Sequence, residues 1–109
     1  MNYRELSTPA LAIDLDAVER NLDHMAKRCR EQGIGLRPHT KTHKTPEVAK
    51  MQVDRGAVGL TVAKVGEAEA LAGAGLDDIL IAFPIFSFLS TMSLCQRRNA
   101  HGRSSSDAG

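Results

Sequence analysis

The amino-acid sequence predicts an α/β fold built from parallel βαβ units. Two apolar runs rich in β-branched residues, 58–63 and 79–83, have the length and composition of buried parallel strands. The alanine-rich segment 65–72 between them is long enough for a helix that crosses from one strand to the next. A complete eight-stranded α/β barrel needs about 250 residues. A chain of 109 residues would therefore hold only the first strands of such a barrel.

The N-terminal part predicts a strand followed by an amphipathic helix. Residues 10–15 follow a Thr-Pro pair and alternate in side-chain type, as expected of a short strand. Asp14 or Asp16 is then expected to cap a helix that extends to about Glu31. Apolar residues recur along this helix at helical spacing and are expected to pack in the core: Val18, Leu22, Met25 and Cys29.

The next segment is expected to be extended and to lead into a second helix. Pro38 biases the residue before it away from the helical conformation. Thr45 and Pro46 are residue types suited to the N-cap and the first helical position, and this helix would end near Gly56. Alternate side chains of an extended segment share one face. This alternation places Arg37, His39 and Lys41 together.

Residues 36–46, with the sequence L-R-P-H-T-K-T-H-K-T-P, are the strongest candidate for a functional site. They concentrate basic side chains at the carboxyl end of a strand that leads into a helix, where α/β proteins place their chemistry. Neighbouring positive charge and partial burial would each lower the pKa of a lysine amine from its usual value of about 10.4. A neutral amine can form a Schiff base with a carbonyl compound. The alternative is a solvated, basic strand end without specific chemistry.

Composition and charge exclude several classes of function. The net charge of +1, from 14 basic and 13 acidic residues, argues against binding to nucleic acid or to an anionic membrane. Aromatic residues make up 4% of the chain, too few for platforms that stack nucleic-acid bases. Cys29 and Cys95 form no C-x-x-C pair, and no apolar run approaches membrane-spanning length. The sequence thus predicts a soluble, cytoplasmic protein.

Further charged residues are interpreted as structural. Lys64 follows the strand 58–63, but one basic residue in that position is weak evidence for a site. Asp77 and Asp78 precede the strand 79–83, at the end of the strand associated with stability, and are interpreted as turn residues. His39 and His43 lack a third ligand nearby, so no residue is assigned to a metal.

Two motifs resemble a known enzyme group. T-P-A-L-A-I-D-L at 8–15 and R-P-H-T-K-T-H-K at 37–44 resemble the start of the D-threonine aldolase and D-serine dehydratase group, pyridoxal 5′-phosphate (PLP) enzymes of the alanine racemase type. The similarity covers about residues 7–84 and includes G-A-V-G-L-T-V-A-K-V-G-E-A-E-A-L-A-G-A-G at 56–75. The resemblance implies the N-terminal portion of a PLP-binding (β/α)8 barrel, incomplete in this chain.

The resemblance also implies site residues and cofactors. The first lysine of the R-P-H-x-K-x-H-K motif carries PLP in that family, which makes Lys41 the expected catalytic and cofactor-binding residue. His43 and Arg37 are expected neighbours of the cofactor ring or phosphate, and His39 a packed barrel residue. The family further implies a divalent metal and a β-rich domain that would pair with the strand 10–15, both outside this chain. Full-length members are expected to be homodimers.

The activity implied by the resemblance is that of a PLP-dependent lyase acting on D-3-hydroxy amino acids. Retro-aldol cleavage to glycine and an aldehyde, as in D-threonine aldolase, is favoured narrowly. Dehydration of D-serine would use the same lysine and is the alternative. Two other possibilities are a non-catalytic PLP-binding protein of the same fold and a translated fragment without function.

The sequence pattern changes near residue 85. Residues 85–109 have no clean helical period and end in a basic, then serine-rich stretch, so they are predicted to be an aberrant or disordered tail. A frameshift or truncation near this point is the hypothesis. Residues 1–84 would then form a partial barrel domain that is inactive alone.

Overall fold

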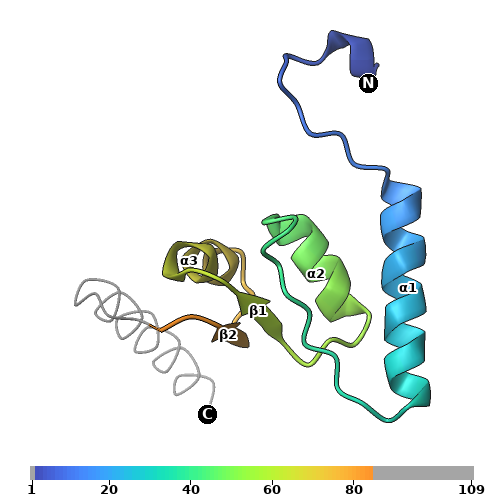
Figure 1. The fold of residues 1–109 in the computed structure, drawn as a ribbon, viewed down its shortest axis with the longest axis vertical. Helices are drawn as coiled ribbons and strands as arrows, with labels where there is room; N and C mark the ends of the chain where they lie inside the picture. Colours follow the sequence, from blue (N-terminus) through green and yellow to red (C-terminus); the bar gives the residue numbers. More distant parts are fainter. Residues whose placement is uncertain (1, 85–109) are drawn as a thin grey trace.

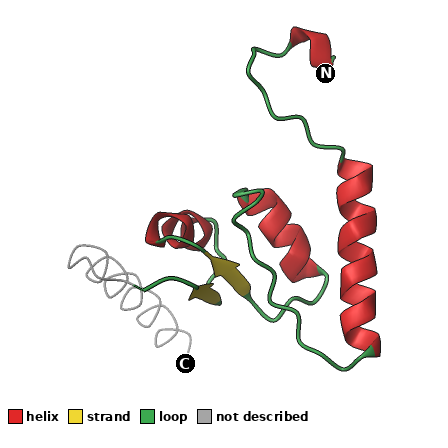
Figure 2. Cartoon of the chain, in the orientation of Figure 1, coloured by secondary structure: helices red, strands yellow, loops and turns green. Residues whose placement is uncertain are grey.

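A computed structural model describes residues 2–84, and the predicted tail at 85–109 lies outside the described residues. Along the chain follow the 3-10 helix η1 (Tyr3–Glu5), α1 (Leu15–Glu31), α2 (Pro46–Asp54), β1 (Leu60–Val62), α3 (Val65–Gly73) and β2 (Ile79–Ile81), as Figures 1 and 2 show. The strands β1 and β2 are parallel, with Leu60 opposite Ile79 and Val62 opposite Ile81. Because α3 connects them, the predicted βαβ unit is confirmed.

The segment before α2 lies beside β1 but forms only one bridge of a parallel ladder, between His39 and Thr61. The Thr61 amide donates to the Pro38 carbonyl and the Thr40 amide donates to the Thr61 carbonyl, each at 2.8 Å. The preceding rung of the ladder would need an N–H at position 38, which proline lacks. The expected strand is therefore extended but short.

The predicted bounds of α2 and α3 agree with the structure within a residue or two. Thr45 has the extended backbone of an N-cap, Pro46 is the first helical residue, and α2 ends before Gly56, whose φ is +96°. A φ in this region is accessible to glycine without steric cost, which suits it to end a helix.

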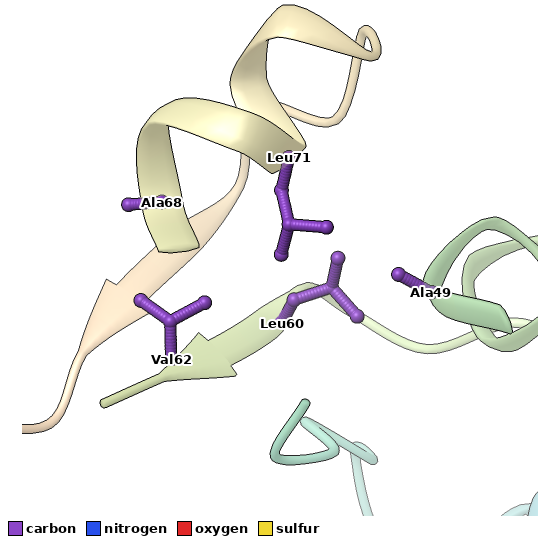
Figure 3. Packing of buried hydrophobic residues seen from close by; sticks show 5 residues of the cluster. All are labelled: Ala49, Leu60, Val62, Ala68 and Leu71. Atoms are coloured by element: carbon purple, nitrogen blue, oxygen red, sulfur yellow. The ribbon is translucent and has the colours of Figure 1, made fainter. Parts of the chain in front are cut away.

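The hydrophobic core lies where α2, β1 and α3 meet. Five buried side chains form it, as Figure 3 shows: Ala49, Leu60, Val62, Ala68 and Leu71. Leu60 and Val62 are almost completely excluded from solvent. This packing fixes β1, and with it the start of α3 and the segment that pairs with β1.

Helix α1 begins at the predicted cap, where the Asp14 side chain accepts a hydrogen bond from the Ala17 amide at 3.2 Å. The expectation that its apolar stripe packs in the core is wrong in part. Within α1 only Ala26 is buried, and Met25 is 49% exposed. Figure 1 shows the reason, since α1 lies beside α2 on the side away from β1 and α3. An ion pair of 2.6 Å between Asp23 and Arg55 joins α1 to the end of α2.

The predicted strand at 10–15 is not formed. Residues 10–14 belong to no helix or strand, and Leu15 is the first residue of α1. Leu11 is 82% exposed. A strand needs a neighbour for its backbone hydrogen bonds, and the N-terminal segment extends away from both strands of the described part (Figure 1). Within residues 2–84, no helix is long and apolar enough to cross a membrane.

Candidate functional site

Lys41 lies in a turn between the segment paired with β1 and the start of α2. The turn is closed by a hydrogen bond of 2.8 Å from the Lys44 amide to the Thr40 carbonyl. Thr40 is buried, whereas Lys41 is exposed. Lys64, at the N-cap of α3 just after β1, is also exposed. Because the paired segments are parallel, both amines follow the carboxyl ends of neighbouring extended segments, the expected place for chemistry.

The exposure of Lys41 corrects one expectation, because partial burial of its side chain is not provided by residues 2–84. The two histidines of the motif each accept a backbone hydrogen bond. The Nδ1 atom of His39 accepts a hydrogen bond from the Lys41 amide at 3.2 Å, and the Nδ1 atom of His43 accepts one from the Thr45 amide at 3.1 Å. An imidazole can accept at Nδ1 only when that nitrogen carries no proton. Both histidines thus hold the turn backbone through their Nδ1 atoms.

His43 is partly buried, and its Nε2 atom has no hydrogen-bond partner among the described residues. Burial lowers the pKa of His43 below its usual value, an effect that the nearby Gln52 side chain partly offsets. The Gln52 Oε1 atom is likewise buried and unpaired in the described chain. The Thr45 hydroxyl lies 3.3 Å from His43 Nδ1 and makes no cap hydrogen bond to α2.

Glu67 is a site residue that the sequence interpretation missed. Its Oε2 atom accepts a hydrogen bond of 2.9 Å from the Ala63 amide, and its Oε1 atom lies 3.6 Å from Lys44 Nζ. The Ala63 hydrogen bond holds the pKa of Glu67 below its usual value, while burial opposes this and the charge of Lys44 adds to it. A signal existed, because Glu67 is three residues after the N-cap of α3. A carboxylate in that position reaches back to the helix start.

Arg37 lies at the other end of the segment. Its guanidinium forms an ion pair of 2.9 Å with Asp78 and donates to the Leu60 carbonyl at 3.3 Å. Asp78 directly precedes β2, so these contacts lie at the amino ends of the strands. The described structure brings Lys41 and His43 together in one turn and places the Arg37 side chain away from them. The predicted structural role of Asp78 agrees with this ion pair.

A cavity of about 310 Å³ lies beside the same segment, between α1 and α2. Its lining is mainly apolar and includes Leu22, Leu36 and Pro38. Lys41 is not among the lining residues, so this cavity does not surround the candidate amine.

Comparison with known proteins identifies the family. Residues 13–99 match the family described as alanine racemase, N-terminal domain. D-threo-3-hydroxyaspartate dehydratase of Delftia sp. (strain HT23) is 49% identical over 77 residues, which cover 71% of this chain and 20% of that protein. D-threonine aldolase of Arthrobacter sp. is 42% identical over 77 residues, with 71% and 20% covered.

A solved structure agrees with these sequence matches. The crystal structure of D-threonine aldolase from Filomicrobium marinum superposes with a TM-score of 0.82 and 41% sequence identity. The superposition covers 87% of this chain and 26% of that one. The chain thus spans about a fifth of the length of the curated relatives it matches.

Proposed function

Because the chain belongs to the alanine racemase N-terminal domain family, we propose that it forms the N-terminal part of a PLP-dependent lyase acting on D-3-hydroxy amino acids. Lys41 is the residue proposed to hold the cofactor. The observation that carries this proposal is the position of Lys41, an exposed amine in the turn between a parallel segment and α2. A cytoplasmic location, a homodimeric assembly and a small D-amino acid as substrate remain predictions.

The residues around Lys41 fit an aldehyde that carries a phosphate. The primary amine of Lys41 makes no ion pair with a described residue and is open to solvent. Lys64 adds positive charge near the same edge, which suits an anionic group, whereas the charge of Lys44 is paired with Glu67. When bound, PLP supplies an electron sink for the carbon next to the substrate amine.

The chain's own residues would hold and present the reactive amine. His39 and His43 fix the backbone on either side of the turn through their Nδ1 atoms. His43 is proposed as a cofactor neighbour because it lies in the same turn as Lys41, with its buried Nε2 atom near the Gln52 side chain. We do not include Arg37 among the proposed cofactor contacts, because Asp78 holds its guanidinium at the amino ends of the strands. Within residues 2–84, no three histidine, cysteine or acidic side chains gather as a metal site, and no metal ligand is assigned.

Two reactions are compatible with this site. Retro-aldol cleavage to glycine and an aldehyde is the first candidate. Dehydration is the second candidate. The observation in its favour is the 49% identity to the Delftia dehydratase, compared with 42% to the Arthrobacter aldolase. The two reactions differ in whether a C–C or a C–O bond of the substrate breaks.

Cofactor capture tests the proposed lysine directly on this chain. PLP added to the purified chain should give an imine absorbance that borohydride converts into a stable adduct. Lys41→Arg keeps the positive charge but removes the primary amine, and should abolish the specific part of this signal. Lys50→Arg, on the exposed face of α2, is the matched control and should leave it unchanged. Equal capture by both variants would refute the role of Lys41.

A chimera tests whether this segment can serve in a working lyase. Residues 1–84 would replace the corresponding segment of the Arthrobacter D-threonine aldolase, and the products from D-threonine would be analysed. Because the rest of the chimera is an aldolase, glycine with an aldehyde is the expected product if the segment supplies a working cofactor lysine. A chimera that folds and binds PLP but forms neither product would contradict a lyase role for this segment.

A further inference from the structure

Lys44 is the last residue of the turn that carries Lys41, and the backbone of Lys44 has an unfavourable conformation. Its φ is +51°, in the left-handed region that residues other than glycine rarely adopt. Such a conformation persists where surrounding contacts hold it. Two contacts are present, the hydrogen bond of 2.8 Å from the Lys44 amide to Thr40 and the ion pair of 3.6 Å from its ammonium to Glu67.

Glu67 joins that turn to the neighbouring strand. Its side chain is only 14% exposed, against 58% for Lys44. One carboxylate oxygen accepts the Ala63 amide just after β1, and the other faces Lys44. Both residues joined by Glu67 follow the carboxyl ends of neighbouring parallel segments. Since Leu60 and Val62 of β1 pack in the hydrophobic core, Glu67 connects the turn to a strand that the core holds in place.

Building on the proposed function, we propose that Glu67 is a positioning residue for Lys41. Its carboxylate holds the Lys44 side of the turn against the end of β1, so that the Lys41 amine is presented in one arrangement. Glu67 does not contact the reacting atoms in this role. It acts through Lys44 and the turn backbone.

Positioning by Glu67 would increase the reactivity of the Lys41 amine, whereas the negative charge of Glu67 alone would decrease it. The two effects can therefore be told apart by experiment. A nearby carboxylate stabilises a lysine in its protonated, unreactive form. Neutralising the carboxylate would thus increase cofactor capture if charge were its whole contribution. A positioning role predicts a decrease.

The experiment compares PLP capture at Lys41 with capture at Lys50 in the same molecules, by borohydride trapping and peptide mass spectrometry. Glu67→Gln keeps the size of the side chain and removes the ion pair, and should lower the Lys41-to-Lys50 ratio about two- to fivefold. Glu67→Ala also removes the acceptor for the Ala63 amide and should lower it about tenfold. Glu47→Gln neutralises an exposed acid in the first turn of α2 and should leave it unchanged.

Circular dichroism and urea midpoints separate positioning from loss of the fold. If Glu67→Ala unfolds, the near-isosteric Glu67→Gln variant decides the question. An unchanged or increased ratio in folded Glu67→Gln would overturn the positioning role while leaving the proposed function intact. A wild-type chain without any preference for Lys41 over Lys50 would overturn both.

Discussion

Replacing Leu60 by alanine tests the packing that holds the candidate site. Leu60 is 1% exposed and lies at the centre of the cluster formed by α2, β1 and α3 (Figure 3). Truncating a fully buried leucine removes its transfer free energy and leaves a cavity, which costs about 3 kcal/mol within a usual range of about 2–5 kcal/mol. Small domains have a total stability of about 5–15 kcal/mol. Leu60→Ala should therefore remove a large part of the stability of this chain.

The neighbouring strand offers a matched control. Leu80 lies in β2 and is 53% exposed, so Leu80→Ala makes the same chemical change where little packing is lost. This variant should cost less than about 1 kcal/mol. Urea unfolding of both variants, followed by far-ultraviolet circular dichroism, measures the two free energies. Equal losses of stability would refute the described core and the fixed position of β1.

Two further predictions concern the surroundings of the site. A Cβ at Gly59 would overlap the Arg37 guanidinium, which must move and give up its ion pair with Asp78, so Gly59→Ala should cost about 1 kcal/mol or less. Gly66→Ala, in open space within α3, should be neutral or stabilising, and urea midpoints measure both variants. The pKa of His43 is lowered in the folded chain, so the unfolded chain binds more protons near this pKa, and stability should fall as the pH drops below about 6.5 through the folded-state pKa. Urea midpoints measured across this range should fall with decreasing pH, and His43→Gln should reduce this dependence. A chain that becomes more stable in acid would contradict the burial of a neutral His43 imidazole.

Much of the fold could be predicted because its signals are local. The Thr-Pro start of α2 and the glycine after its end are each readable from a few neighbouring residues. The apolar run 58–63 likewise contains β1. The failures share another cause, since the segment 10–14 and the apolar stripe of α1 need partners that adjacent residues do not reveal.

The site was predictable in part for similar reasons. The position of Lys41 follows from the strand, turn and helix that surround it. Alternation predicts which face Arg37 shares but not its partner, and the guanidinium pairs with Asp78 at the amino ends of the strands. The role of Glu67 depends on a contact with Lys44 across two separate turns, which no single stretch of sequence encodes.

The most direct test of the central claim is to locate the PLP adduct on the wild-type chain. After brief exposure to PLP and borohydride, the chain would be digested and the modified lysine identified by tandem mass spectrometry. The account predicts that the adduct lies predominantly on Lys41, with little on Lys44, Lys50 and Lys64, which are also exposed. An even distribution over these lysines would contradict it, because the amine in the turn would then have no special affinity for the cofactor.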